Sequence, residues 1–290
     1  MSIIRSIGAG IQTPAVNAVI PHLVPEEHLM RYNGINATMQ SIVQFAAPAV
    51  AGAVLSVGTF RATLFIDILT ALLGIGLLSC VLLPKQETAN ENVSVFSEMK
   101  AGICYSFSDK VIGKILMVYG LFILLSVPAG FMAALLVSRV YGDVYWYLTA
   151  VELVGFAGMA LGGVLMGVWG GFKSRIKTFV VGLLILSLMT IGMGLSPYFI
   201  LYLVLMFVYS IALTMIQTAT TTIIQEQTES TMQGRVFGLM GAMYSGFLPV
   251  GMAIFGPLAD MLPLQWIMVG SGTALIFVTV YLQAKSKLDL

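Results

Sequence analysis

Residues 178–225 read TFVVGLLILSLMTIGMGLSPYFILYLVLMFVYSIALTMIQTATTTIIQ and contain no Asp, Glu, Lys or Arg. At about 1.5 Å per residue, a single helix of this length would be more than twice as long as the roughly 30 Å hydrocarbon core of a bilayer. The segment Gly194-Leu195-Ser196-Pro197 interrupts the stretch with residues typical of a turn. The stretch therefore predicts two antiparallel membrane-spanning helices.

Similar apolar stretches occur along the whole chain. The further predicted spans are 3–21, 32–60, 62–83, 115–138, 144–172, 236–259 and 264–284. Charged residues make up only 9% of the sequence, against about 25% in a typical soluble domain. Because so few charges could not cover a water-exposed surface of this size, lipid must be much of the solvent. We expect an all-α polytopic membrane protein with about nine transmembrane helices.

The distribution of basic residues predicts the orientation of these spans. Loops on one side of the predicted membrane hold most of the Lys and Arg, including Lys85, Lys100 and Lys173. Loops on the other side hold only Arg61 and Arg139. Since basic loops stay in the cytoplasm, we expect the C-terminus to be cytoplasmic in a cell membrane.

The one long loop divides the chain into three parts. Residues 1–83 form a partial N-terminal helical half with three spans, 84–114 form a cytoplasmic linker, and 115–290 form a six-helix half. Within the linker, Phe96, Met99, Ile103 and Phe107 recur at helical spacing between charged residues. This pattern predicts an amphipathic helix on the inner membrane surface.

Several functional classes receive no support from the sequence. The net charge of +1 gives no general attraction to nucleic acid. Cys80 and Cys104 lie far apart and match no metal or redox spacing. Phosphate-loop, HExxH and GxSxG motifs are missing. We therefore expect neither an enzyme nor a cofactor or metal site, and the expected partners are the lipid bilayer, a small-molecule substrate and protons.

Short motifs in the first spans carry a resemblance to known transporters. The segment Arg5-Ser-Ile-Gly8-Ala-Gly10 resembles an RxxGxG motif, and Ala47-Pro48-Ala-Val-Ala-Gly52 resembles the antiporter motif of a fifth helix. Pro48 and Gly52 would then belong to a gating segment.

Two further motifs lie in the C-terminal part. The segment from Gly163 through Leu165 to Gly170 resembles the GxLaDrxG loop motif, with Gly167 in place of the acid. Gly234 and Arg235 resemble the loop before an eleventh helix. Together these motifs resemble the major facilitator superfamily, in particular its macrolide-efflux-like drug:proton antiporters. The resemblance implies a major-facilitator-type bundle in which the nine spans match helices four to twelve, with the first three of twelve absent.

Three charged residues inside predicted spans are candidates for proton coupling or substrate binding. Glu152 lies about 12 Å from the outer end of its span and Asp67 about 9 Å from the outer end of its own. Charges at such depths are costly and mostly face a cavity or a partner. A structural hydrogen bond for Glu152, or an acid reaching the interface near Arg61 for Asp67, are the alternatives. For Arg5, the resemblance implies proton coupling, and a polar helix end at the outer surface is the alternative.

These observations favour a secondary active transporter that exports small amphipathic drugs such as macrolides in exchange for protons. Two alternatives stay open at this point. One is an inactive, truncated transporter fragment, and the other is a non-transporting membrane subunit that needs a partner chain.

Overall fold

The computed structural model describes residues 2–57, 60–80, 95–142 and 144–286. Within these ranges every regular element is helical, which confirms the predicted all-α class. The α-helices are α1 (Ser2–Leu23), α2 (Leu29–Val57), α3 (Phe60–Ser79), α4 (Val95–Ser108), α5 (Lys110–Gly130), α6 (Ala133–Val140), α7 (Tyr145–Trp169), α8 (Arg175–Leu195), α9 (Phe199–Gln227), α10 (Gln233–Met261) and α11 (Leu264–Ser286). A short 3-10 turn, Glu26–His28, joins α1 to α2.

Seven helical segments among the described residues are long and apolar enough to cross a membrane. They are α2 with the turn before it, α5 continuing into α6, and each of α7 to α11. The apolar part of α3, Ile68–Leu77, is shorter. The uncharged stretch 178–225 forms α8 and α9, with its break at Ser196 and Pro197 as predicted.

The predicted span 115–138 is not continuous. Helix α5 ends at Gly130, and α6 starts at Ala133 after a two-residue break. Pro128 precedes the break and has no amide hydrogen to donate to the carbonyl one turn earlier. The missing hydrogen bond weakens the helix just before its end.

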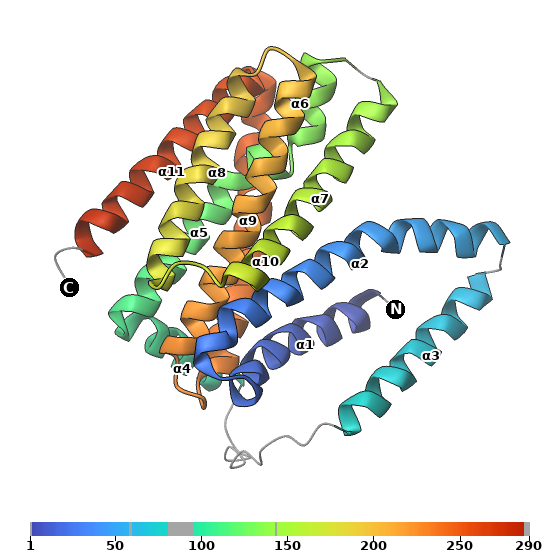
Figure 1. Ribbon diagram of the computed structural model, residues 1–290, viewed down its shortest axis with the longest axis vertical. Helices are drawn as coiled ribbons and strands as arrows, with labels where there is room; N and C mark the ends of the chain where they lie inside the picture. Colours follow the sequence, from blue (N-terminus) through green and yellow to red (C-terminus); the bar gives the residue numbers. More distant parts are fainter. Residues whose placement is uncertain (1, 58–59, 81–94, 143, 287–290) are drawn as a thin grey trace.

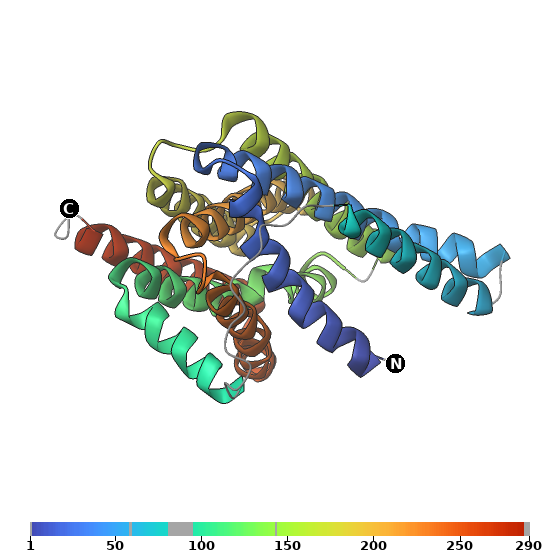
Figure 2. The ribbon, with the colours of Figure 1, turned by 90° about the horizontal axis from the view of Figure 1, so that it is seen from below.

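The helices fall into two groups in space. Figure 1 shows α5 and α7 to α11 as one bundle, with α1, α2 and α3 lying beside it, and Figure 2 shows α2 and α3 extending away from it. Helix α2 crosses α7, and this pairing is the most extensive contact between the two groups. The cavity described below lies between them.

Glycines on two faces of α7 allow the close approach of its neighbours. A methyl group added at Gly158 would lie 2.5 Å from the Phe207 carbonyl oxygen of α9. One added at Gly34 of α2 would lie 2.5 Å from the Gly167 amide nitrogen of α7. Since real carbon atoms do not approach this closely, only glycine permits these two helix crossings.

Candidate functional site

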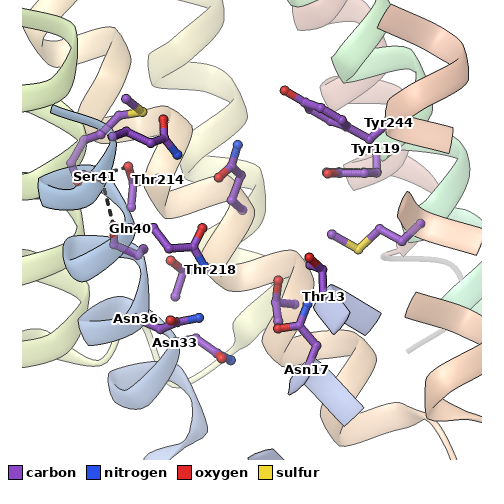
Figure 3. A pocket seen from close by; sticks show the side chains of 16 residues that line it. Thr13, Asn17, Asn33, Asn36, Gln40, Ser41, Tyr119, Thr214, Thr218 and Tyr244 are labelled. Atoms are coloured by element: carbon purple, nitrogen blue, oxygen red, sulfur yellow. Dashed lines mark hydrogen bonds between the residues drawn. The ribbon is translucent and has the colours of Figure 1, made fainter. Parts of the chain in front are cut away.

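A polar and aromatic cavity lies between the two groups of helices. It consists of three adjoining spaces of about 310, 510 and 700 Å³, and Tyr119 and Tyr244 line all three. Side chains of α1, α2, α5, α7, α9 and α10 form the walls. Spaces of this size hold drug-sized ligands. Figure 3 shows the first space, with Asn36 and Gln40 on one side and the two tyrosines on the other.

One wall is a stripe of amide side chains on α2. Asn33, Asn36, Gln40 and Gln44 follow one another at intervals of three or four residues, so they lie on one face of the helix. The neighbouring helix α9 adds Gln217 and several threonines to the lining, and Figure 3 shows Thr214 and Thr218 beside the α2 residues. Among the residues that the structure describes, the walls of these spaces carry no Lys or Arg.

The 510 Å³ space has a different wall. Glu152 of α7 lines it together with Phe122, Phe156, Tyr209 and other apolar side chains. The Glu152 side chain is exposed to this space rather than packed into the bundle. It is the only Asp or Glu among the described residues that line the three spaces. The arrangement places one ionisable group beside a large apolar surface.

Buried hydrogen bonds close one end of the cavity. The Asn33 amide nitrogen donates to the Thr222 hydroxyl at 2.9 Å and to the Gln225 side-chain oxygen at 2.7 Å. The Gln225 amide nitrogen in turn donates to the Asn17 carbonyl oxygen at 2.9 Å. These bonds join α1 and α2 to α9, and we call this region, with the turns 24–28, 170–174 and 228–232, the closed end.

The candidate loop motif reaches the closed end. Gly163 packs its backbone against Gly34 and Thr38 of α2. Gly170 ends α7 at φ +76°, a left-handed conformation that favours glycine, and lies against the Arg31 side chain. Leu165, between them, is half exposed on the outside of the bundle.

Next to this motif, an ion pair joins the start of α8 to the end of α9. Arg175 donates to Glu226 at 3.0 Å and to the Gly170 carbonyl oxygen at 3.2 Å. Both charged side chains are mostly buried. The pair fixes the turn between α7 and α8 against the end of α9.

The other motif residues are more scattered. Arg235, at the start of α10, pairs with Glu98 of α4 through contacts of 2.7 and 3.2 Å. The guanidinium holds the pKa of Glu98 below its ordinary value, mainly through these hydrogen bonds. Methyl groups added at Gly52 or Gly234 would meet open space, and Pro48 lies inside α2.

Two candidate charges cannot be placed in the cavity. Arg5 belongs to α1 and Asp67 to α3, and their side chains lie outside the described part of the structure. The residues that the sequence reasoning did not single out are the α2 amides and Gln217. Their helical spacing in a charge-free span was the available signal.

The chain matches a known protein family. The model of the Major Facilitator Superfamily matches residues 1–151. The chain belongs to the major facilitator superfamily. It is therefore a membrane transporter of that superfamily, and its seven apolar helical segments agree with a multi-span protein.

Two individual proteins of similar sequence show which members of the superfamily the chain resembles. Macrolide efflux protein A of Streptococcus pyogenes is 28% identical over 281 residues, covering 96% of this chain and 69% of that protein. The protein of the same name from Enterococcus faecalis is 28% identical over 253 residues, covering 86% of this chain and 78% of that protein. The chain is thus macrolide-efflux-like within the major facilitator superfamily.

A solved structure supports the fold. A bacterial homologue of the iron transporter ferroportin, in an outward-facing state, superposes with a TM-score of 0.76 at 16% identity. The match covers 96% of this chain and 70% of that one. It shows that this major facilitator chain shares the arrangement of helices with that protein.

Proposed function

We propose that the chain exports small amphipathic drugs such as macrolides and takes up protons in exchange. The observation that carries the proposal is the position of Glu152, which is the one Asp or Glu among the described residues lining a drug-sized space with several aromatic side chains. A macrolide-like molecule with an amine would place its apolar body on the aromatic wall and its charge near this carboxylate. The names of the relatives support this substrate class.

The exchange follows from the two states of one carboxyl group. When Glu152 is charged, it compensates a cationic substrate in a space that carries no basic side chain among its described lining residues. When it takes up a proton, that compensation is lost and the substrate is released. The same site then serves the proton and the drug in turn, which is the requirement for antiport.

Further parts of the proposal concern orientation and the remaining charges. We assign the closed end to the cytoplasm, because the basic residues of the predicted loops gather on that side. Residues 1–83 and 115–290 would be the two halves that move relative to each other, linked by 84–114. Asp67 and Arg5 would assist proton coupling. The segments around Pro48, Gly163 and Gly234 would form the gate.

Everted membrane vesicles test the proposal. With an imposed pH gradient, the wild-type chain should accumulate a labelled macrolide, and Glu152→Gln should abolish this accumulation at an unchanged protein level. Glutamine keeps the size and hydrogen-bonding ability of the side chain but cannot exchange a proton. Glu229→Gln is the matched control, because Glu229 is exposed and lies outside the three spaces. Unchanged accumulation by Glu152→Gln would remove this residue from the coupling mechanism, and poor expression would indicate a structural role.

A further inference from the structure

The amide stripe on α2 contains two kinds of residue. Asn33 is 5% exposed and both of its donor bonds reach α9, so it belongs to the closed end. Asn36, Gln40 and Gln44 lie farther along the same face and line the cavity. Within the described residues, none of these three side chains makes a hydrogen bond with another protein group. Their donors and acceptors therefore point to the cavity with no protein partner.

Helix α9 supplies a fourth group of the same kind. Gln217 is exposed although its neighbours from Ala212 to Thr220 are, apart from Leu213, buried. It lines both the 310 Å³ and the 510 Å³ spaces, as Gln44 does. Its side chain also makes no hydrogen bond among the described residues. The two neighbouring helices thus present unpaired amides to one space.

Simple packing does not account for this arrangement. An uncharged polar group that enters an apolar phase without a hydrogen-bond partner costs free energy, and polar groups in spans mark solute paths. Three such groups on one face of α2, with a fourth on the neighbouring helix α9, need a partner that arrives from solution. A solute or water must supply it.

The chemistry of an amide restricts that solute. Each amide offers one acceptor oxygen and two N–H donors. A hydroxyl group donates and accepts, so it can bond to both ends of an amide. An anionic group would find no Lys or Arg among the described lining residues, and a cation has Glu152 in the adjoining space. The amides therefore match a neutral part of a molecule that is rich in hydroxyl and ether oxygens.

We infer that Asn36, Gln40, Gln44 and Gln217 form a subsite for the hydroxylated, neutral part of the exported molecule, such as its sugar units. The inference rests on the proposed export function. It assigns the neutral part of the substrate to the amides, and the apolar and cationic part to the aromatic wall beside Glu152. Because Gln44 and Gln217 line both spaces, one molecule can reach from the amide subsite to the aromatic wall beside Glu152. The amides select for oxygen-rich substrates, whereas the aromatic wall and the carboxylate accept any apolar cation.

Equilibrium binding to the purified full chain in nanodiscs tests the inference separately from transport. The two probes are erythromycin, a cationic macrolide with two sugars, and tetraphenylphosphonium, an apolar cation with no hydrogen-bonding group. Gln40→Leu and Asn36→Leu each remove one amide. The matched control is Gln12→Leu, because Gln12 is exposed on α1 and lies outside the three spaces.

We expect each cavity variant to weaken erythromycin binding about two- to tenfold, the effect of one neutral hydrogen bond. Tetraphenylphosphonium binding should not change, and neither probe should respond to Gln12→Leu. Gln40→Asn retains an amide and should recover part of the erythromycin affinity, which separates a lost contact from misfolding. Equal losses for both probes, or no loss for either, would overturn the subsite and favour a merely hydrated wall.

A transport measurement in vesicles distinguishes failure of the subsite from failure of the proposed export function. If the wild-type chain binds both probes and the variants lose erythromycin selectively, the subsite stands even when vesicles show no proton-driven export. In that case only the proposed coupling fails. If the wild-type chain binds neither probe, the subsite is wrong.

Discussion

Replacement of Asn33 by alanine tests how the closed end is held. The Asn33 amide lies at the centre of the bonds between α2 and α9, with donor distances of 2.9 Å to Thr222 and 2.7 Å to Gln225. Removal of the amide leaves the buried Gln225 side-chain oxygen without its donor. The Thr222 hydroxyl keeps its own bond to the Thr218 carbonyl oxygen at 2.9 Å. The cost therefore falls on one buried acceptor.

The size of this cost sets the expected effect. A buried acceptor without a donor costs about 1–3 kcal/mol relative to a state in which water reaches it. Since about 1.4 kcal/mol corresponds to a factor of ten in an equilibrium constant, Asn33→Ala should shift the balance toward an opened end by about 5- to 150-fold. Only the closed arrangement is destabilised, because water can bond to the Gln225 oxygen once the helices separate.

Distances between paired spin labels measure this shift. Labels at positions 27 and 229 lie on the turns on either side of the closed end, where the native Glu27 and Glu229 are both exposed. The native cysteines, Cys80 and Cys104, are exposed and must first be replaced by serine. In Asn33→Ala, the population with a longer label separation should grow. An unchanged distance distribution would refute the reasoning that this hydrogen bond holds the two helix groups together.

A matched control lies on the next turn of α2. Asn36 is also an asparagine on the cavity face, but its side chain has no hydrogen bond among the described residues. Asn36→Ala should therefore leave the distance distribution as it is in the unmodified protein. A shift of the same size in both variants would mean that loss of any α2 amide opens the end.

Three further changes test other parts of the structure. Gly34→Ala should lower the thermal unfolding temperature, because the new methyl would lie 2.5 Å from a backbone nitrogen of α7 and overpacking costs about 1–3 kcal/mol. Gly74→Ala is the control and should leave this temperature unchanged, because a methyl there has nothing within 4 Å. Equal unfolding temperatures for the two variants would contradict the tight crossing of α2 and α7. Glu98→Gln should raise hydrogen exchange in α4 at neutral pH. Because its arginine partner lowers the pKa of Glu98 from 4.5, wild-type protection of α4 should persist above pH 4.5 and decline only as the pH falls through the lowered value; a decline near neutral pH would refute the pairing. In intact cells, a cysteine at Lys173 should react only with membrane-permeant thiol reagents and one at Tyr145 also with impermeant reagents, and the reverse pattern would reject the proposed orientation.

The sequence was sufficient to predict the helices because lipid allows few alternatives. A backbone that crosses a membrane must satisfy its own hydrogen bonds, so a long charge-free stretch becomes a helix. The break between α8 and α9 was visible at Pro197, since the stretch was too long for one span. The break after Gly130 was not visible, because the span has an ordinary length and prolines are tolerated in such helices.

Which helices pack against one another was harder to predict than the helices themselves. The sequence shows several glycines within α7, but it does not tell which helices approach them. The structure shows that Gly158 and Gly162 face α9, whereas Gly163 and Gly167 face α2. Adjacent positions on a helix point in directions about 100° apart, so the two faces serve two neighbours. Which neighbour takes which face depends on the whole bundle.

The candidate site was predicted only in its charged part. Glu152 stood out because a charge inside a span is costly, and the structure places it in the cavity wall. The α2 amides did not stand out, because a count of charged residues gives Asn and Gln no weight. Their spacing at 33, 36, 40 and 44 was readable as one helical face. That this face meets α9 required the structure.

Among the described residues, the buried ion pair and the buried amide bonds lie in different places. The mostly buried ion pair Arg175–Glu226 joins two parts of the six-helix bundle. The bonds from Asn33 and Gln225, in contrast, are neutral and join that bundle to α1 and α2. A transporter must break and remake the contacts between its moving parts in every cycle. A neutral hydrogen bond, with a net contribution of about 1 kcal/mol, can be exchanged for water at little cost, whereas separating a desolvated ion pair costs several times more. The buried ion pair therefore suits the interior of the bundle, and the neutral amides suit the surface between the two proposed halves.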